Sequence, residues 1–89
     1  MVEREVTIRN KMGLHTRPAA SIVKLAAKYK SDFFIEKDGI EINGKSIIGV
    51  MTLAAEQGSK MLVRFNGADE EDAAKAMIDL FDRGFNEEI

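Results

Sequence analysis

The chain has 89 residues, of which 13 are Lys or Arg and 15 are Asp or Glu, so its formal net charge is −2. This length predicts one domain over residues 1–89 and excludes large enzyme folds such as a (β/α)₈ barrel. The absence of cysteine excludes disulfides and thiolate metal sites, and the charge balance argues against a nucleic-acid partner. The charged N-terminus and the lack of a ~20-residue apolar run predict a cytoplasmic protein with no membrane partner.

The first two predicted elements are a strand and a helix. Apolar and polar positions alternate over residues 2–9, which is the pattern of a half-buried strand, and residues 10–13 end it. From Pro18 the apolar spacing becomes three and four residues, which predicts a helix that ends near residues 28–30. Proline suits the first turn of a helix, and basic side chains suit its last turn. The expected buried face consists of Ala19, Ile22, Val23 and Ala26.

The middle of the chain predicts a hairpin followed by a short helix. Residues 32–37 are aromatic and β-branched, and residues 40–43 return as a second strand. The Asp-Gly pair at positions 38–39 between them is typical of a two-residue type I′ turn. Ser46 is a candidate N-cap for a short apolar helix over residues 47–55.

The last third of the chain predicts a strand over residues 61–65 and a second long helix. Residues 69–72 are all acidic, which suits the positive end of a helix dipole, and Gly84 suits the position just after a helix. The expected buried face of this helix consists of Ala73, Ala76, Met77, Leu80 and Phe81. The order βαββαβα predicts an α+β open-faced sandwich, in which a four-stranded antiparallel sheet has its helices packed on one face and water on the other.

A candidate phosphoryl site lies at residues 13–18, GLHTRP, where a loop turns into the first helix. An isolated histidine is most often an exposed or capping side chain, but the surroundings of His15 favour chemistry. Backbone N–H groups at a helix start bind anions, and a guanidinium is suited to phosphate. We therefore expect Thr16, Arg17 and Pro18 to cradle a phosphoryl group that His15 accepts as a nucleophile. No general base is evident beside it, which predicts a carrier and not a complete enzyme.

Residues 39–46, GIEINGKS, match the GxxxxGK[ST] pattern of nucleotide-hydrolysing enzymes. The pattern binds phosphate only as a loop between a strand and a helix. Here its four middle residues are expected to form a strand, with Ile40 and Ile42 on one face, so we interpret the match as coincidental. A nucleotide-binding enzyme is the alternative, which equilibrium dialysis with ATP and Mg²⁺ tests.

The short helix carries more apolar side chains than it can bury. Ile47, Ile48, Met51, Leu53 and Ala54 cannot all face inward, so we expect some of this apolar surface to form an exposed patch of the kind that binds partners. Ser46 at the edge of this patch suits a regulatory phosphorylation. A phosphate there is stabilised by the helix dipole, but it adds about two negative charges to the binding surface.

A basic row accompanies this patch on the first helix. Arg17, Lys24 and Lys28 share one helical face, with Ala20 between them. Such a face is usually just solvated. Because this row begins beside His15, it also suits the docking of an acidic partner.

Two of these segments resemble the HPr family, the histidine-containing phosphocarriers of the bacterial phosphoenolpyruvate-dependent sugar phosphotransferase system. Residues 13–20, GLHTRPAA, resemble the family's active-site signature, and residues 44–51, GKSIIGVM, resemble its regulatory serine segment. The resemblance extends over essentially the whole chain, and the predicted element order is that of the family.

The resemblance implies that enzyme I passes a phosphoryl group to Nδ1 of His15, from which it moves to a IIA protein or domain of a sugar transporter. Arg17 would stabilise this group, and Ser46 would be the target of an HPr kinase/phosphorylase whose product can act with a catabolite-control transcription factor. The resemblance implies a monomer without cofactor or metal. The implied docking residues are Leu14, Ala20, Lys24, Ile47, Ile48 and Met51.

The sequence does not decide which protein receives the phosphoryl group from His15. Residues 51–59 and 84–88 also resemble NPr, the nitrogen-related paralogue, which keeps the histidine but serves a regulatory IIA protein. An interaction module controlled mainly through Ser46 is a further alternative.

Overall fold

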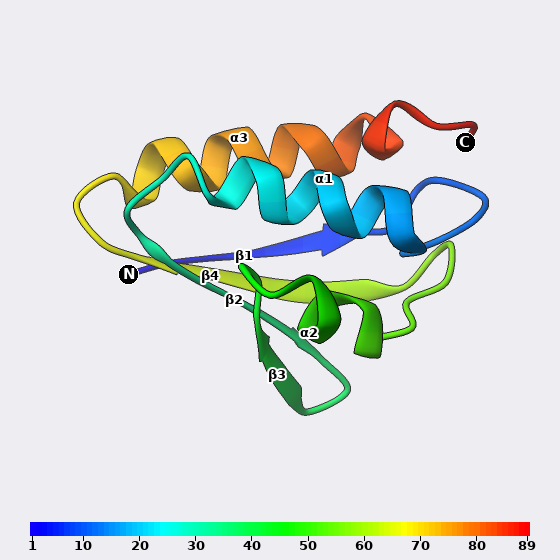
Figure 1. The fold of residues 1–89 in the computed structure, drawn as a ribbon, viewed down its shortest axis with the longest axis horizontal. Helices are drawn as coiled ribbons and strands as arrows, with labels where there is room; N and C mark the ends of the chain where they lie inside the picture. Colours follow the sequence, from blue (N-terminus) through cyan, green and yellow to red (C-terminus); the bar gives the residue numbers. More distant parts are fainter.

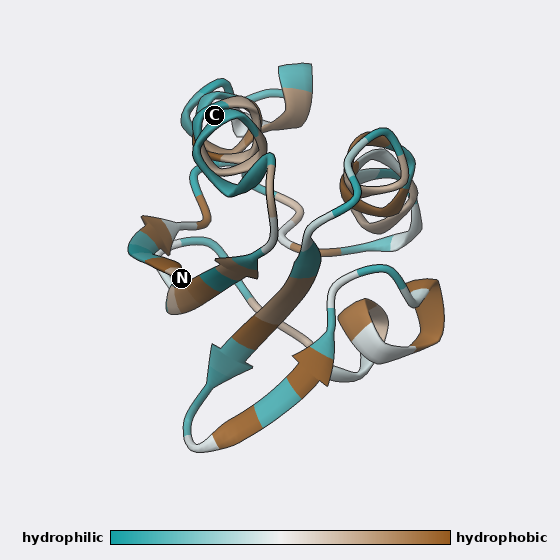
Figure 2. Cartoon of the chain, turned by 90° about the vertical axis from the view of Figure 1, so that its left-hand side faces the viewer, coloured by the Kyte–Doolittle hydropathy of each residue, from teal (hydrophilic) through white to brown (hydrophobic).

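A computed structural model describes all residues 1–89. Four strands form one antiparallel sheet in the order β1-β4-β2-β3, and α1 and α3 lie side by side on one of its faces (Figures 1 and 2). The predicted βαββαβα order and the open-faced sandwich are thereby confirmed. No helix is both long enough and apolar enough to cross a membrane. The elements are β1 (Val2–Thr7), α1 (Thr16–Ala26), β2 (Asp32–Lys37), β3 (Ile40–Asn43), α2 (Ile47–Thr52), β4 (Lys60–Asn66), α3 (Glu70–Asp82) and the 3₁₀ turn η1 (Gly84–Asn86).

The core lies between the sheet and the two long helices. β4 pairs with β1 on one side and with β2 on the other, so its inward side chains occupy the centre of the sheet. Phe65 of β4 lies opposite Phe33 of β2, and the two rings stack with their centroids 4.7 Å apart. These pairs hold the sheet under α1 and α3.

The other face of the sheet is open to water, as expected from its polar side chains. Arg64 of β4 forms ion pairs there with carboxylates from the other three strands, at 2.6 Å to Glu3, 2.7 Å to Glu36 and 2.8 Å to Glu41. The hydrogen bonds to Glu36 and Glu3 raise the pKa of Arg64 above its usual value. The strands are thus linked by charge on the face that lacks helices.

The C-terminal ends of α1 and α2 both come earlier in the chain than predicted. α1 begins at Thr16, because Pro18 is tolerated anywhere in the first turn, where no backbone donor is needed. It ends at Ala26, so residues 28–30 lie in the turn that follows. α2 ends at Thr52 and not at residue 55, because Ala54 has a left-handed backbone with φ 47°.

The remaining local predictions hold with small corrections. Asp38 and Gly39 both have positive φ, as a type I′ turn requires. Gly84 follows α3 in the left-handed conformation. The buried face of α3 includes Ala74, whereas Ala76 is only half-buried.

Asp69 departs most from its predicted role. It was expected to act with its neighbours on the dipole of α3, but its side chain makes no capping bond. Its carboxylate instead accepts backbone N–H bonds from Lys30 at 2.8 Å and Ser31 at 2.9 Å, and a further bond from the Ser31 hydroxyl. Asp69 therefore ties the loop after α1 to the start of α3.

We expect Asp69→Asn to lower the Tm at pH 7 more than at about pH 2–3. The hydrogen bonds from the Ser31 side chain and the Lys30 N–H hold the pKa of Asp69 below its usual value. The ionised Asp69 carboxylate thus stabilises the fold fully at pH values above the pKa that Asp69 has in the unfolded chain. This stabilisation is lost as the pH falls through the lower pKa that Asp69 has in the folded chain. Thermal unfolding at both pH values measures the effect, with Asp72→Asn as the control. An equal loss of Tm at both pH values would contradict this role.

Candidate functional site

His15 occupies the N-cap of α1. Its backbone is extended and its carbonyl accepts the N–H of Ala19 at 3.1 Å, so the chain turns into the helix at this residue. The N–H groups of Thr16 and Arg17 have no hydrogen-bond partner within the protein. The imidazole side chain is 35 % exposed beside them. A partly accessible ring nitrogen therefore lies at a helix start with free donors, which is a suitable place for an anion.

The loop before His15 is held by backbone contacts. Gly13 has φ +70°, and Leu14 donates its N–H to the carbonyl of Ala55 at 2.9 Å. The Leu14 side chain, predicted to contact partners, is only 5 % exposed. The structure assigns Leu14 to the core, where it anchors the loop, and removes it from the exposed docking surface.

A carboxylate lies against the histidine, although no such group was expected. Nε2 of His15 is 2.9 Å from Oε1 and 3.0 Å from Oε2 of Glu87, which is only 12 % exposed. Burial alone would raise the pKa of Glu87, but the hydrogen bonds from His15 and Asn10 and the charge of Arg17 lower it below its usual value. The contact joins residues 72 positions apart, so no local pattern could reveal it.

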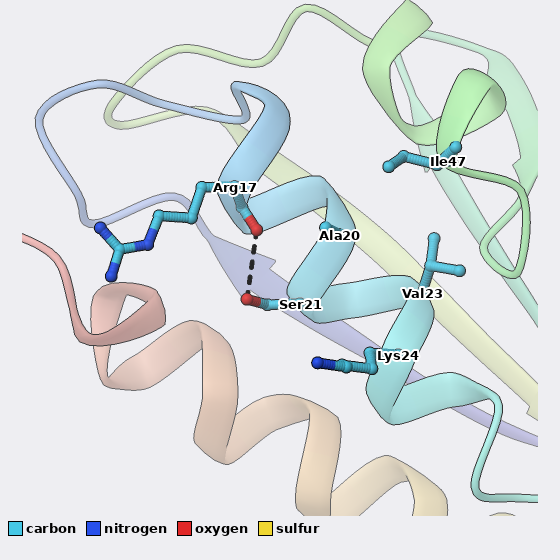
Figure 3. Close-up of a pocket in the computed structure, with 6 residues that line it drawn as sticks. All are labelled: Arg17, Ala20, Ser21, Val23, Lys24 and Ile47. Atoms are coloured by element: carbon cyan, nitrogen blue, oxygen red, sulfur yellow. Dashed lines mark hydrogen bonds between the residues drawn. The ribbon is translucent and has the colours of Figure 1, made fainter.

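The guanidinium of Arg17 is free to bind an anion. Its carbonyl accepts the hydroxyl of Ser21 at 3.1 Å, but its guanidinium forms no hydrogen bond or ion pair within the protein. In Figure 3 this side chain extends away from α1 toward the C-terminal segment. A planar guanidinium without a partner beside His15 can take two oxygens of a phosphoryl group. Thr16, Arg17 and Pro18 directly follow His15 in the first turn of α1, and their role as a phosphoryl cradle stays a prediction.

A hollow between α1 and α2 lies next to this site. Its volume is about 440 Å³. It is lined by Arg17, Ala20, Ser21, Val23, Lys24 and Ile47 (Figure 3). Beside it on α2, Ile48 is 75 % and Met51 41 % exposed, as predicted for a binding patch. Lys28 does not line this hollow but an adjacent one between α1 and α3, which shares Ser21 and Lys24 with it.

Ser46 caps α2, as predicted. Its Oγ accepts the N–H of Gly49 at 3.1 Å, and the residue is exposed at the edge of the apolar patch. The segment before it does not form a phosphate-binding loop, because residues 40–43 are strand β3. Nζ of Lys45 donates to the carbonyl of Tyr29 at 2.9 Å and is therefore committed to the fold. The nucleotide-binding alternative has no structural support.

The family model described as "PTS HPr component phosphorylation site" matches residues 2–83. The chain belongs to the HPr family. It is 46% identical over 88 residues to "Phosphocarrier protein HPr" of Xylella fastidiosa strain Temecula1, covering 99% of each chain. It is also 46% identical over 78 residues to "HPr-like protein Crh" of Halalkalibacterium halodurans, covering 88% of this chain and 93% of the relative.

Solved structures agree with this assignment. The crystal structure of HPr-C-His from Thermoanaerobacter tengcongensis superimposes with a TM-score of 0.95 at 45% identity, covering 100% of both chains. An HPr dimer from the same organism has a TM-score of 0.77 at 45% identity and covers 96% of this chain and 98% of its own. The family assignment therefore establishes a phosphocarrier of the phosphotransferase system and leaves its oligomeric state open.

We expect Gly13→Ala to destabilise the chain by about 3 kcal/mol and Gly58→Ala by only ~1 kcal/mol. Both glycines are left-handed, so both substitutions strain the backbone. A Cβ at Gly13 would in addition lie 2.5 Å from the carbonyl oxygen of Ala55, whereas one at Gly58 meets nothing within 4 Å. Denaturant unfolding measures the difference. Equal losses would show that the close approach to Ala55 does not constrain the loop.

Proposed function

We propose that His15 accepts a phosphoryl group from phospho-enzyme I on Nδ1 and passes it to IIA proteins or domains of sugar transporters. The observation that carries this proposal is the position of His15 at the start of α1, beside two unpaired backbone N–H groups and the free guanidinium of Arg17. Because Glu87 occupies Nε2, Nδ1 is the nitrogen left for phosphorus. We place this relay in the cytoplasm.

The transfer moves one phosphoryl group between two nitrogens. The lone pair on Nδ1 attacks phosphorus, and the bond between phosphorus and the donor's histidine nitrogen breaks, returning its electron pair to the donor. The guanidinium of Arg17 and the N–H groups of Thr16 and Arg17 stabilise the charge on the oxygens during this transfer. The same steps in reverse direction deliver the group to a IIA recipient. The chain is thus a stoichiometric carrier that depends on its partners for each half of the reaction.

The surface next to His15 suits partners that are acidic around an apolar centre. Arg17 and Lys24 supply positive charge at the hollow, while Ala20 and Ile47 line it. Ile48 and Met51 continue the apolar area along α2. Charge complementarity of this kind increases the rate of encounter. A monomer presents this surface freely, so we propose that the monomer is the acting form, which size-exclusion chromatography tests.

We expect one added phosphoryl group in the intact mass of the protein after incubation with phosphoenolpyruvate and enzyme I. The group should be lost on acid treatment, as an N–P bond is, and His15→Ala should take up none. Unchanged Tm in that variant shows that the loss is chemical and not structural.

Labelling of His15→Ala would disprove the site, and failure of the wild type with a competent enzyme I would disprove the relay. Incubating the labelled protein with a sugar-branch or a nitrogen-branch IIA protein identifies the recipient.

We further propose that phosphorylation of Ser46 by an HPr kinase/phosphorylase weakens docking and connects the chain to a catabolite-control transcription factor. The supporting observation is that Ser46 is exposed, caps α2 and adjoins the apolar patch. A phosphate on Oγ keeps a favourable position at the helix start while it adds negative charge where acidic partners dock.

We expect Ser46→Asp to weaken the interaction with enzyme I roughly three- to tenfold, which corresponds to ~1 kcal/mol of lost attraction. Ser46→Asn is the matched control, because both residues cap helices well and only aspartate adds a charge. Isothermal titration of each variant with enzyme I at low salt measures the difference. Equal affinities of the two variants would rule out electrostatic control at this position.

A further inference from the structure

The C-terminal segment continues past the end of α3 and lies near the loop that precedes α1 (Figure 1). Three consecutive residues, Gly84, Phe85 and Asn86, have positive φ and turn the chain out of α3. The ring of Phe85 is buried and packs edge-to-face on Phe81, with centroids 4.9 Å apart. Beyond this turn the carbonyl of Glu88 accepts the N–H of Lys11 at 2.9 Å. The segment is therefore fixed on both sides of Glu87.

Asn10 holds the Glu87 side chain in place. Its amide is fully buried, and Nδ2 donates to Oε1 of Glu87 at 2.9 Å and to the carbonyl of Gly13 at 2.8 Å. Oδ1 of Asn10 has no partner. Rotating the amide by 180° would place this oxygen against two acceptors, so the orientation with the NH₂ group toward Glu87 is the favoured one. A buried donor thus fixes one carboxylate oxygen beside the histidine.

This carboxylate determines which nitrogen of His15 carries the proton. The hydrogen bonds to Glu87 and the charge of Arg17 outweigh its burial and lower its pKa, so it is ionised at neutral pH. An ionised carboxylate only accepts hydrogen bonds. Nε2 of His15, at 2.9 and 3.0 Å from the two oxygens, must therefore be the donor. In the neutral ring this leaves the lone pair on Nδ1.

We propose that Glu87 is a positioning residue for phosphoryl transfer, which keeps the proton on Nε2 of His15 and offsets the positive charge of the phosphorylated ring. This inference rests on the proposed function. When the lone pair on Nδ1 forms the bond to phosphorus and the donor nitrogen leaves with its electron pair, the ring retains its Nε2 proton and becomes cationic. Glu87 faces that proton, in the manner of the buried carboxylate that orients the histidine of a catalytic triad.

The test compares Glu87→Gln with Glu88→Gln. Both substitutions remove one negative charge from neighbouring positions, but Glu88 pairs with Lys11 and does not contact His15. In Glu87→Gln the NH₂ group of Asn10 retains the glutamine carbonyl as its acceptor, which directs the glutamine NH₂ toward Nε2. Long-range ¹H–¹⁵N spectra report the proton on each ring nitrogen, and the chain has one histidine, so the signals belong to His15. Rapid-quench labelling with phospho-enzyme I gives the rate of acceptance.

We expect the wild type and Glu88→Gln to carry the proton on Nε2 and to accept phosphoryl groups at similar rates. Glu87→Gln should shift the proton toward Nδ1 and slow acceptance about tenfold while the chain stays folded at the assay temperature, as circular dichroism checks. An unshifted proton, or equal slowing in both variants, would overturn the inference. A wild type that takes up no phosphoryl group would overturn the relay itself, and the ring spectra distinguish that result from a failure of Glu87.

Discussion

The hydrogen bond from the N–H of Leu14 to the carbonyl of Ala55 determines how the two functional surfaces meet. It fastens the loop before α1 to the segment that follows α2, at a distance of 2.9 Å. The approach is possible only because position 13 has no Cβ and Leu14 is buried beneath the loop. As a result, the partly exposed histidine at the start of α1 and the apolar patch on α2 keep a fixed spacing. In the proposed relay, a partner that docks on α2 would find the imidazole in a defined place.

Backbone pairing at the end of β1 also holds the loop before α1 in place. β1 ends at Thr7, yet Ile8 still exchanges backbone hydrogen bonds with Gly58 and Ser59, which carries the sheet pairing up to the base of the His15 loop. Asn10 lies two residues after Ile8 and is fully buried. Rigid pairing at this edge is what allows a single amide to control both the loop, through Gly13, and the C-terminal segment, through Glu87.

The parts of the structure that the sequence predicts are those governed by nearby residues. Alternation defines the strands, the Asp-Gly pair at positions 38–39 defines the hairpin, and Ser46 marks a helix start because each of these signals acts within a few positions. The histidine was found in the same way, from its place before a helix. The links made by Asp69 and Glu87 span about 40 and 70 positions and depend on how the elements pack, so no local pattern contains them. The burial of Leu14 was missed for the same reason, since it depends on the segment at Ala55.

The charges around His15 oppose one another, and this opposition suits a carrier. In the proposed relay, the guanidinium of Arg17 and the free N–H groups at the start of α1 would attract the phosphoryl oxygens. The carboxylate of Glu87 is on the other side of the ring, where it favours a positive imidazole but repels a dianion that approaches too closely. A site with only positive groups would bind the phosphoryl group tightly and release it slowly. In the proposed relay, uptake and delivery use the same nitrogen, so a site that balances attraction with repulsion serves both directions better than one that maximises binding.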